Sequence, residues 1–167
     1  MPQQFSPIRG AQGFQQSNPS ILAIASLLGS LQIFQASGGI QALRARSIGL
    51  TGLLEKYLHQ SRFYTPLPVN NEATRFGFTV ITPEEQRSRG AQLSLLFLPT
   101  GSGLMQKISA YLKSNGVIGD ERNPDVIRLA PVPLYNTEEE CIRAVEVLDR
   151  GMREAKEAAG LIDHPLH

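Results

Sequence analysis

One segment decides how the second half of the chain folds, namely Asp125-Val126-Ile127-Arg128-Leu129-Ala130-Pro131-Val132-Pro133-Leu134-Tyr135-Asn136. It opens with a short apolar run, from Val126 to Leu129, that is typical of a β-strand. Asn136 then begins a helix, because asparagine is a preferred N-cap residue and Glu139, three positions later, completes an asparagine variant of the capping box. The segment therefore predicts a strand, a connection and a helix, in that order.

Arg128 is the one charged residue of the strand in this segment. Alternation along the strand places it on the face opposite Ile127 and Leu129, inside an otherwise uncharged stretch. An arginine in such a place is paired, extends to water or binds an anionic ligand. Its guanidinium group matches a carboxylate bidentately, which lysine cannot do. Two interpretations follow: a structural ion pair within the domain, or a site for an anionic ligand.

Strands and helices precede this segment and a helix follows it, so the pattern predicts an α+β domain over residues 76–160. Period-2 runs centred on Phe78 and Leu95 predict two strands. Ser102 caps a helix that ends at Asn115-Gly116, and Val117-Ile118 is expected to form a short strand. The inner face of the last helix is an apolar stripe made of Cys141, Val145, Leu148 and Met152.

The first part of the chain is expected to be a loop followed by a two-helix arm. Residues 1–18 show little periodicity, and Asn18-Pro19 caps a helix from Ser20 to about Gln35 that is apolar on nearly every side. Gly38-Gly39 ends this helix, and a second helix completes the arm (19–60). Residues 61–75 form a loop before the domain, and residues 161–167 form a tail.

Asn18 also permits a second interpretation. The N-terminus of a helix, with its free backbone N–H groups and its dipole, suits a phosphate as well as a simple cap. The spacing around Ser17 and Asn18 leaves the two interpretations open.

Composition excludes several classes of function. Sixteen basic residues against fifteen acidic ones give a net charge of +1, so no overall field recruits nucleic acid or an anionic membrane. One cysteine and three histidines provide neither a disulfide framework nor a metal site with recognisable spacing. The chain starts without a signal-peptide pattern, and its longest apolar stretch is too short to cross a bilayer. We therefore expect a cytoplasmic protein with no metal, no nucleic acid and no membrane partner.

Several segments, in this order and spacing, resemble kynureninase. The resemblance extends from about Phe5 to about Leu148, and its most specific part is the run from Ile127 to Asn136. The matching segments are Gly13-Phe14-Gln15, Ser17-Asn18-Pro19, Leu50-Thr51-Gly52, Ile81-Thr82-Pro83, Arg89-Gly90, Gln92-Leu93-Ser94, Ile127-Arg128 and Ala130-Pro131-Val132-Pro133-Leu134-Tyr135-Asn136.

The resemblance implies a fold and an activity. Kynureninases are homodimeric pyridoxal 5'-phosphate enzymes of fold type I, and this chain resembles their helical arm and small C-terminal domain, a short, mainly antiparallel sheet covered by helices. They hydrolyse L-kynurenine or 3-hydroxy-L-kynurenine to L-alanine and anthranilate or 3-hydroxyanthranilate, in tryptophan catabolism and NAD biosynthesis. The resemblance implies that residues 1–18 line the site, that Ser17 and Asn18 contact the cofactor, and that Asn18 and Arg128 bind the substrate.

The chain also departs from the family. The resemblance covers only the C-terminal portion, so the Schiff-base lysine and most ligands of the cofactor are missing. None of the four lysines, Lys56, Lys107, Lys113 and Lys156, stands in the family's lysine context. Because the cofactor chemistry needs that lysine, no residue here is assigned a catalytic role and the isolated chain is expected to be inactive.

This departure leaves several interpretations. The first is a C-terminal piece of kynureninase, either a shortened gene model or one half of a split enzyme that needs the complementing half. The second is a non-catalytic paralogue that binds a full-length subunit or a carboxylate ligand. An unrelated small α+β binding module is a further alternative, which the run around Arg128 disfavours.

Overall fold

The computed structural model describes residues 6–70 and 75–161. The chain divides into two units, one ending at Ala42 and the other beginning at Leu43, whose relative positions are not determined, so that each is described by itself. The elements are two short 3-10 helices, Ala11–Phe14 and Gln86–Ser88, with α1 (Ile21–Ala36), α2 (Gly39–Gln60), β1 (Gly77–Val80), β2 (Leu93–Leu98), α3 (Leu104–Ser114), β3 (Asp120–Arg122), β4 (Val126–Leu129) and α4 (Glu138–Ala158).

The second unit is built on an antiparallel sheet with the strand order β1-β2-β4-β3. Residues that face each other across neighbouring strands share one side of the sheet. On one side these pairs are apolar and buried, namely Phe78 with Phe97, Val80 with Leu95, Leu95 with Ile127, and Leu93 with Leu129. The alternation predicted for β1, β2 and β4 is thus confirmed.

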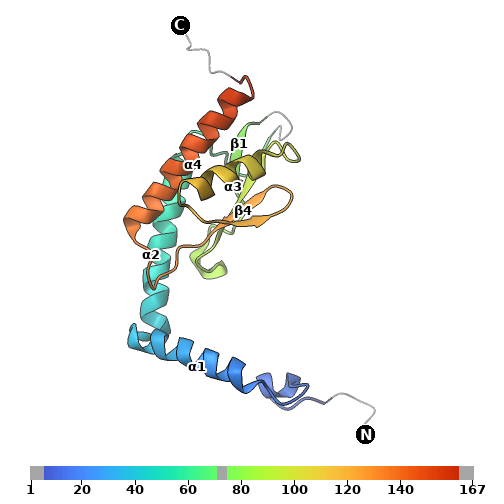
Figure 1. Cartoon of the computed structure of the whole chain (residues 1–167), viewed down its shortest axis with the longest axis vertical. Coiled ribbons are helices and arrows are strands. Elements are labelled where there is room, and N and C mark those ends of the chain that lie inside the picture. The colour runs from blue at the N-terminus through green and yellow to red at the C-terminus, as the bar shows by residue number, and fades with distance from the viewer. Residues whose placement is uncertain (1–5, 71–74, 162–167) are drawn as a thin grey trace. The chain divides into compact units, whose positions relative to one another are not determined.

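Three helices cover this apolar side (Figure 1). Leu50, Leu54 and Leu58 of α2 join one core with the inward residues of the sheet, of α3 and of α4. The C-terminal part of α2 therefore belongs to the small domain. An antiparallel sheet covered by helices is the predicted α+β fold, in agreement with a small C-terminal domain of a fold-type-I enzyme.

The short strand after α3 lies further along the chain than expected. The sequence predicted a strand at Val117-Ile118, but the strand is β3, Asp120–Arg122. Val117 instead closes α3, because its N–H donates to the carbonyl of Leu112 while Gly116, with φ of 79°, donates to Lys113. This is a Schellman motif, and because it uses the N–H of Val117, that group does not pair with a strand.

The start of α4 also differs from the prediction. Thr137, and not Asn136, is the N-cap residue: its hydroxyl accepts from the N–H of Glu140, whose carboxylate accepts from the N–H of Thr137. The side chain of Asn136 is used elsewhere, because its Oδ1 accepts from the N–H of Val132 and its Nδ2 donates to Glu140. The capping box therefore lies one residue later than expected.

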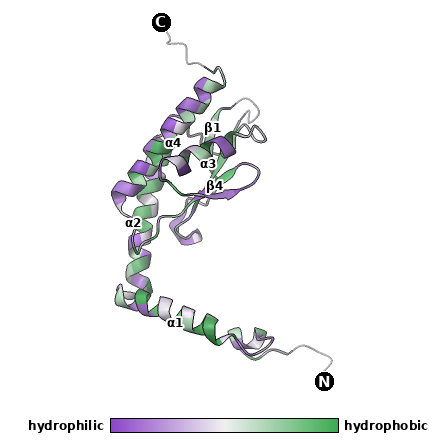
Figure 2. Cartoon of the chain, in the orientation of Figure 1, coloured by the Kyte–Doolittle hydropathy of each residue, from purple (hydrophilic) through white to green (hydrophobic). Residues whose placement is uncertain are grey.

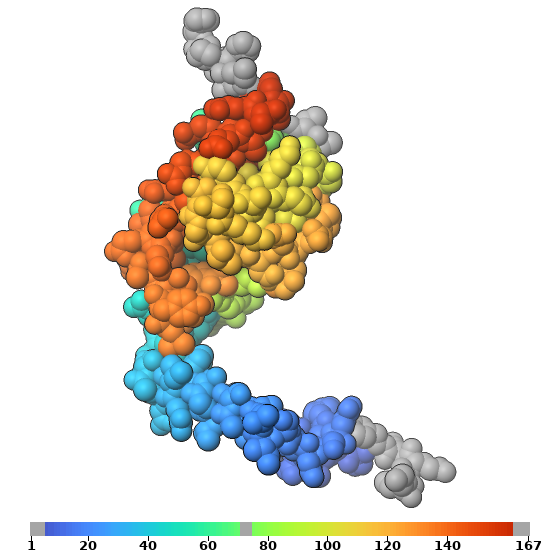
Figure 3. Space-filling model, viewed as in Figure 1, coloured from blue at the N-terminus to red at the C-terminus, as the bar shows by residue number. Residues whose placement is uncertain are grey.

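Helices α3 and α4 approach each other closely at Gly151. Figure 3 shows the surfaces of α3 (yellow) and α4 (orange to red) in contact. A Cβ added at Gly151 would lie 2.7 Å from Cδ1 of Tyr111, which is too close for two carbon atoms. A residue without a side chain is therefore required at this crossing.

The first unit contains α1, which buries none of its side chains. Its apolar residues point in all directions, and Figure 2 shows no hydrophilic side along this helix. Leu22, Leu27 and Leu31 are 80%, 60% and 54% exposed. An uncovered surface of this kind is uncommon on a monomer.

The start of α1 corrects a second prediction about caps. The helix begins at Ile21 with Ser20 at the N-cap position, so Asn18 does not cap it. The backbone carbonyl of Ser20 accepts the first helical hydrogen bond, from the N–H of Ile24, and the Ser20 side chain forms no capping hydrogen bond. The predicted end is confirmed: Gly38, with φ of 94°, follows the helix.

No single helix within residues 6–70 and 75–161 is long and apolar enough to cross a membrane. The broken pair formed by α1 and α2 meets the same criteria of length and composition when the two helices are taken together.

We expect replacement of two helical glycines by alanine to change stability in opposite directions. Gly151→Ala should lower the free energy of unfolding by about 1–2 kcal/mol, because overpacking outweighs the gain in helix propensity. Gly49→Ala should raise it by about 0.5–1 kcal/mol, because nothing lies within 4 Å of the added Cβ. Urea unfolding of the full chain measures both values. A stabilising Gly151→Ala would refute the close crossing.

We expect the capping box to make stability depend on pH. Hydrogen bonds from Asn136 and from the N–H of Thr137 lower the pKa of Glu140 below its ordinary value of 4.5. A lowered pKa stabilises the fold above the unfolded value, and this stabilisation disappears as the pH falls through the folded value. Glu140→Gln should therefore be less stable than the parent at pH 7 and should lose less on acidification. Glu146→Gln, on the same helix, is the matched control and should behave as the parent does.

We expect the full chain to self-associate through α1. The double variant Leu27→Gln/Leu31→Gln places two polar side chains one turn apart on this helix and should shift the chain toward monomer in sedimentation velocity. Ile118→Gln, which replaces a more exposed apolar residue (78%) in the second unit, should leave the distribution unchanged. A parent chain that is monomeric at high concentration would contradict the expectation.

Candidate functional site

Arg128 lies on the open side of the sheet, as the alternation predicted. Its neighbours in the strand, Ile127 and Leu129, are buried in the core, whereas the side chain of Arg128 is 28% exposed. The register places Ser94 of β2 on one flank of Arg128 and Asp120 of β3 on the other. The three residues therefore form a row across the open side of the sheet.

Asp120 is the partner of Arg128. A single carboxylate oxygen of Asp120, Oδ2, accepts hydrogen bonds from both Nε (2.9 Å) and Nη2 of Arg128. The same oxygen lies 2.8 Å from Nη2 of Arg122. Of the two interpretations of Arg128, the ion pair within the domain is therefore present in this structure.

The sequence analysis missed Asp120 and Arg122. Both lie in β3, which was predicted three residues too early, so neither was considered beside Arg128. A signal existed: Asp120 and Arg122 alternate with Glu121, and only the two residues after Arg122, Asn123-Pro124, separate them from the segment that begins at Asp125. A charged strand followed by an Asn-Pro turn indicates a hairpin whose charges meet across it.

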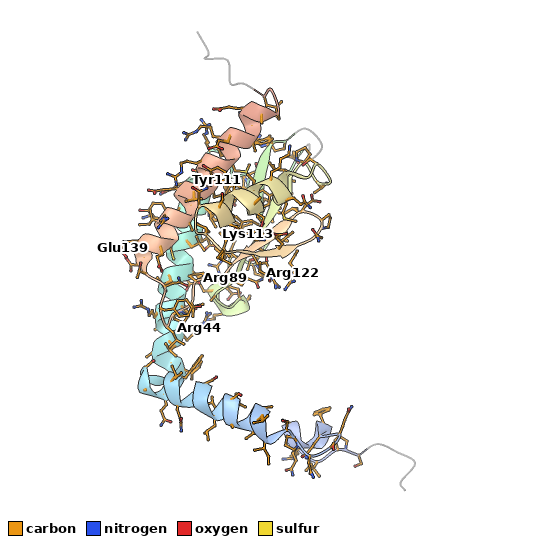
Figure 4. All side chains as sticks on the ribbon, in the orientation of Figure 1. Arg44, Arg89, Tyr111, Lys113, Arg122 and Glu139 are labelled. Carbon is orange, nitrogen blue, oxygen red and sulfur yellow. The ribbon has the colours of Figure 1, made fainter. Side chains whose placement is uncertain are left out.

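The charges of β3 are divided between the two sides of the sheet. Hydrogen bonds from Arg128, with the charge of Arg122, hold the pKa of Asp120 below its usual value, so this carboxylate is ionised at neutral pH. Glu121 points to the other side, where Nζ of Lys113 and the hydroxyl of Ser109 donate to it and lower its pKa. Figure 4 labels Lys113 on α3 and Arg122 at the β3–β4 hairpin. The carboxylate of Asp120 thus pairs with arginines on one side of the sheet, and that of Glu121 pairs with Lys113 on the other.

Arg89, from another of the matching segments, has a structural role here. Its guanidinium group forms a bidentate ion pair with Glu55 of α2, and its side chain is 3% exposed. Arg44 donates to the carbonyl oxygens of Gln86 (2.7 Å) and Arg89 (3.0 Å). Arg44 and Arg89 lie near each other beside α2 in Figure 4. The two arginines attach the loop between β1 and β2 to this helix.

Ser17 and Asn18 belong to the first unit, and both are exposed. The carbonyl of Ser17 accepts a hydrogen bond from Nε2 of Gln15 (2.8 Å), while the side chain of Asn18 bonds to no described residue. Because the two units are not placed relative to each other, Asn18 and Arg128 are described separately. Their joint contact with a substrate remains a prediction.

The other candidate side chains have structural surroundings. Cys141 is buried in the core, where burial raises the pKa of its thiol, as expected for a small apolar residue. His59 stacks on Tyr64 with a centroid distance of 4.4 Å, while His164 and His167 lie outside the described residues. Within residues 6–70 and 75–161, no group of three histidine, cysteine or acidic residues is arranged to hold a metal ion.

The described residues do not by themselves fit pyridoxal phosphate. That cofactor needs a lysine beside its ring and donors around its phosphate. Lys113 is paired with Glu121 on the sheet side opposite Arg128. Lys56 borders a recess whose lining includes Glu55 and Glu84 but no arginine or hydroxyl side chain to hold a phosphate. The described residues therefore supply no step of a reaction through that cofactor.

Comparison with known proteins agrees with the resemblance in the sequence. Residues 43–148 match the family model described as "Kynureninase C-terminal domain". The chain is 49% identical over 149 residues to kynureninase of Yarrowia lipolytica, which covers 87% of this chain and 34% of that protein. It is 47% identical over 164 residues to kynureninase of Eremothecium gossypii, a match that covers 95% of this chain and 36% of that protein. It is 45% identical over 159 residues to kynureninase 2 of Neurospora crassa, a match that covers 95% of this chain and 31% of that protein.

The chain therefore spans about a third of the length of these relatives. The part matched by the family model, residues 43–148, contains the sheet, the core and the paired Arg128 and Asp120. By the match to this model and by its identity to these relatives, the chain belongs to the kynureninase family and corresponds to its C-terminal domain.

Proposed function

We propose that this chain provides the carboxylate-binding side of a kynureninase site, in which Arg128 holds the amino-acid carboxylate of the substrate. The observation that carries the proposal is the position of Arg128 on the open side of the sheet. There its guanidinium group is oriented by Asp120 through Nε and Nη2, while its Nη1 forms no hydrogen bond with any described residue. A carboxylate and a guanidinium group bind bidentately with good geometry.

The substrate in this proposal is L-kynurenine or 3-hydroxy-L-kynurenine, and the products are L-alanine with anthranilate or 3-hydroxyanthranilate. Arg128 binds and orients the carboxylate. Asn18 and Ser17, through the resemblance, contribute to the cofactor and substrate end of the same site. The proposed compartment is the cytoplasm.

The rest of the site belongs to a segment that this chain does not contain. Pyridoxal phosphate supplies the electron sink for carbon–carbon cleavage when it is bound. Lys113 and Lys56 do not fit that cofactor, and no lysine of the chain stands in the family's lysine context, so in this proposal the chain functions with a complementing polypeptide or a full-length subunit. The apolar surface of α1 is available for such a partner.

We expect the isolated chain, given pyridoxal phosphate and 3-hydroxykynurenine, to form no 3-hydroxyanthranilate above a heat-killed control. Co-expression with the remaining two thirds of the Yarrowia lipolytica kynureninase should restore turnover. In that pair, Arg128→Lys should raise KM by about tenfold or more, because lysine cannot form the bidentate contact. Arg87→Lys, at an exposed position of the 3-10 helix Gln86–Ser88, is the matched control and should leave KM unchanged.

The C-terminal third of the Yarrowia lipolytica enzyme, co-expressed with the same two thirds, is the positive control for the assay. Turnover by the isolated chain would contradict the proposed dependence on a partner. A stable pair that lacks turnover, when the positive control is active, would instead identify the chain as a non-catalytic partner.

A further inference from the structure

Arg128 and Asp120 face each other across the β3–β4 hairpin, and the geometry of their contact is specific. Asp120 is the register partner of Arg128 in the antiparallel pairing of the two strands. Side chains of register partners leave the sheet on the same side and close together. The backbone pairing alone therefore places Asp120 beside Arg128.

A guanidinium group offers two edges to a carboxylate. One edge consists of Nε and Nη2, and the other consists of Nη1 and Nη2. Asp120 uses the first edge, since its Oδ2 accepts from Nε and Nη2 of Arg128. No described residue accepts a hydrogen bond from Nη1. The second edge is therefore open to a carboxylate of a ligand.

The local charge remains favourable for an anion although Arg128 is already paired. Oδ2 of Asp120 also contacts Arg122, so two guanidinium groups share one carboxylate. The group of three carries a net charge of +1. With Asp120 alone, the pair would be neutral and would attract a carboxylate only through hydrogen bonds.

We propose that Asp120 is a positioning residue: it holds the Nε and Nη2 edge of Arg128 so that the Nη1 and Nη2 edge binds a carboxylate. Asp120 does not occupy the ligand's place, and Arg122 maintains the positive charge of the site. This inference rests on the proposed function for the identity of the ligand, but the orientation of Arg128 by Asp120 is testable without turnover.

The first test uses the full chain, isotope-labelled at arginine, and follows the side-chain resonances of Arg128 by NMR. Arg128→Lys assigns these resonances by removing them. In the parent chain the Nε–Hε proton should exchange slowly with water, and Asp120→Asn should accelerate this exchange about tenfold, because the charge-assisted hydrogen bond that protects it is weakened. Glu121→Gln, with the same change of charge on the adjacent residue, should leave the exchange unchanged.

The second test titrates the same samples with acetate, as a probe for a carboxylate, against chloride at equal ionic strength. Acetate should shift the terminal Nη resonances of Arg128 in the parent chain while the Nε–Hε signal stays in place. Asp120→Asn should weaken acetate binding severalfold, and Asp120→Glu should restore part of it.

Three outcomes would overturn the proposal. The first is acetate binding to Asp120→Asn as tightly as to the parent, or more tightly, which would make Asp120 a competitor of the ligand. The second is a shift of the Nε–Hε signal with acetate, and the third is no acetate binding by the parent. Backbone spectra of each variant show whether it has folded, and Asp120→Ser replaces Asp120→Asn if the latter has not.

Turnover separates this inference from the proposed function. In the co-expressed pair, Asp120→Asn should raise KM for 3-hydroxykynurenine about tenfold while kcat changes little, because Asp120 acts on binding through Arg128. If the parent pair has no turnover while both NMR results are as expected, the proposed function fails and the positioning role of Asp120 stands. If the parent pair has turnover but neither NMR result is observed, the proposed function stands and the positioning role of Asp120 fails.

Discussion

Burial of one apolar side of the sheet is the constraint on which the second unit depends. Every register pair on one side of β1, β2 and β4 is apolar, and α2, α3 and α4 cover that side. Because side chains alternate strictly along a strand, the same pairing sends Ser94, Arg128 and Asp120 to the other side. One register thus produces both the core and the candidate site. A change of register that rearranged the core would also disrupt the candidate site.

The two units differ in how far their helices bury their apolar residues. Helix α4 has one apolar side, which it buries, and its polar side faces water, so the second unit completes its own core. Helix α1 has apolar residues all round and buries none of them. A helix without a polar side gains stability only from surroundings that cover it. The match to a third of each relative agrees with this difference, because covering surfaces can lie in the rest of such a protein.

The sequence allowed the prediction of what depends on periodicity: the α+β class, the buried sides of the strands, the burial of Cys141 and the side on which Arg128 lies. The errors came from competition between neighbouring residues. Helix α1 has Ser20, not Asn18, at its N-cap position. Thr137 caps α4 in place of Asn136, and the backbone of Val117 is used by the end of α3. Asp120 was missed for another reason, since its role exists only after β3 pairs with β4, and one-dimensional patterns do not specify which strands pair.

The short turn between β3 and β4 also determines which side of the sheet Asp120 faces. Arg122 and Val126 are register partners, and Asn123, Pro124 and Asp125 are the three residues between them. A shift of the register by one residue, as insertion or loss of one residue in this turn would favour, would move Asp120 to the opposite side of the sheet from Arg128. The length of this turn is therefore part of the geometry of the candidate site.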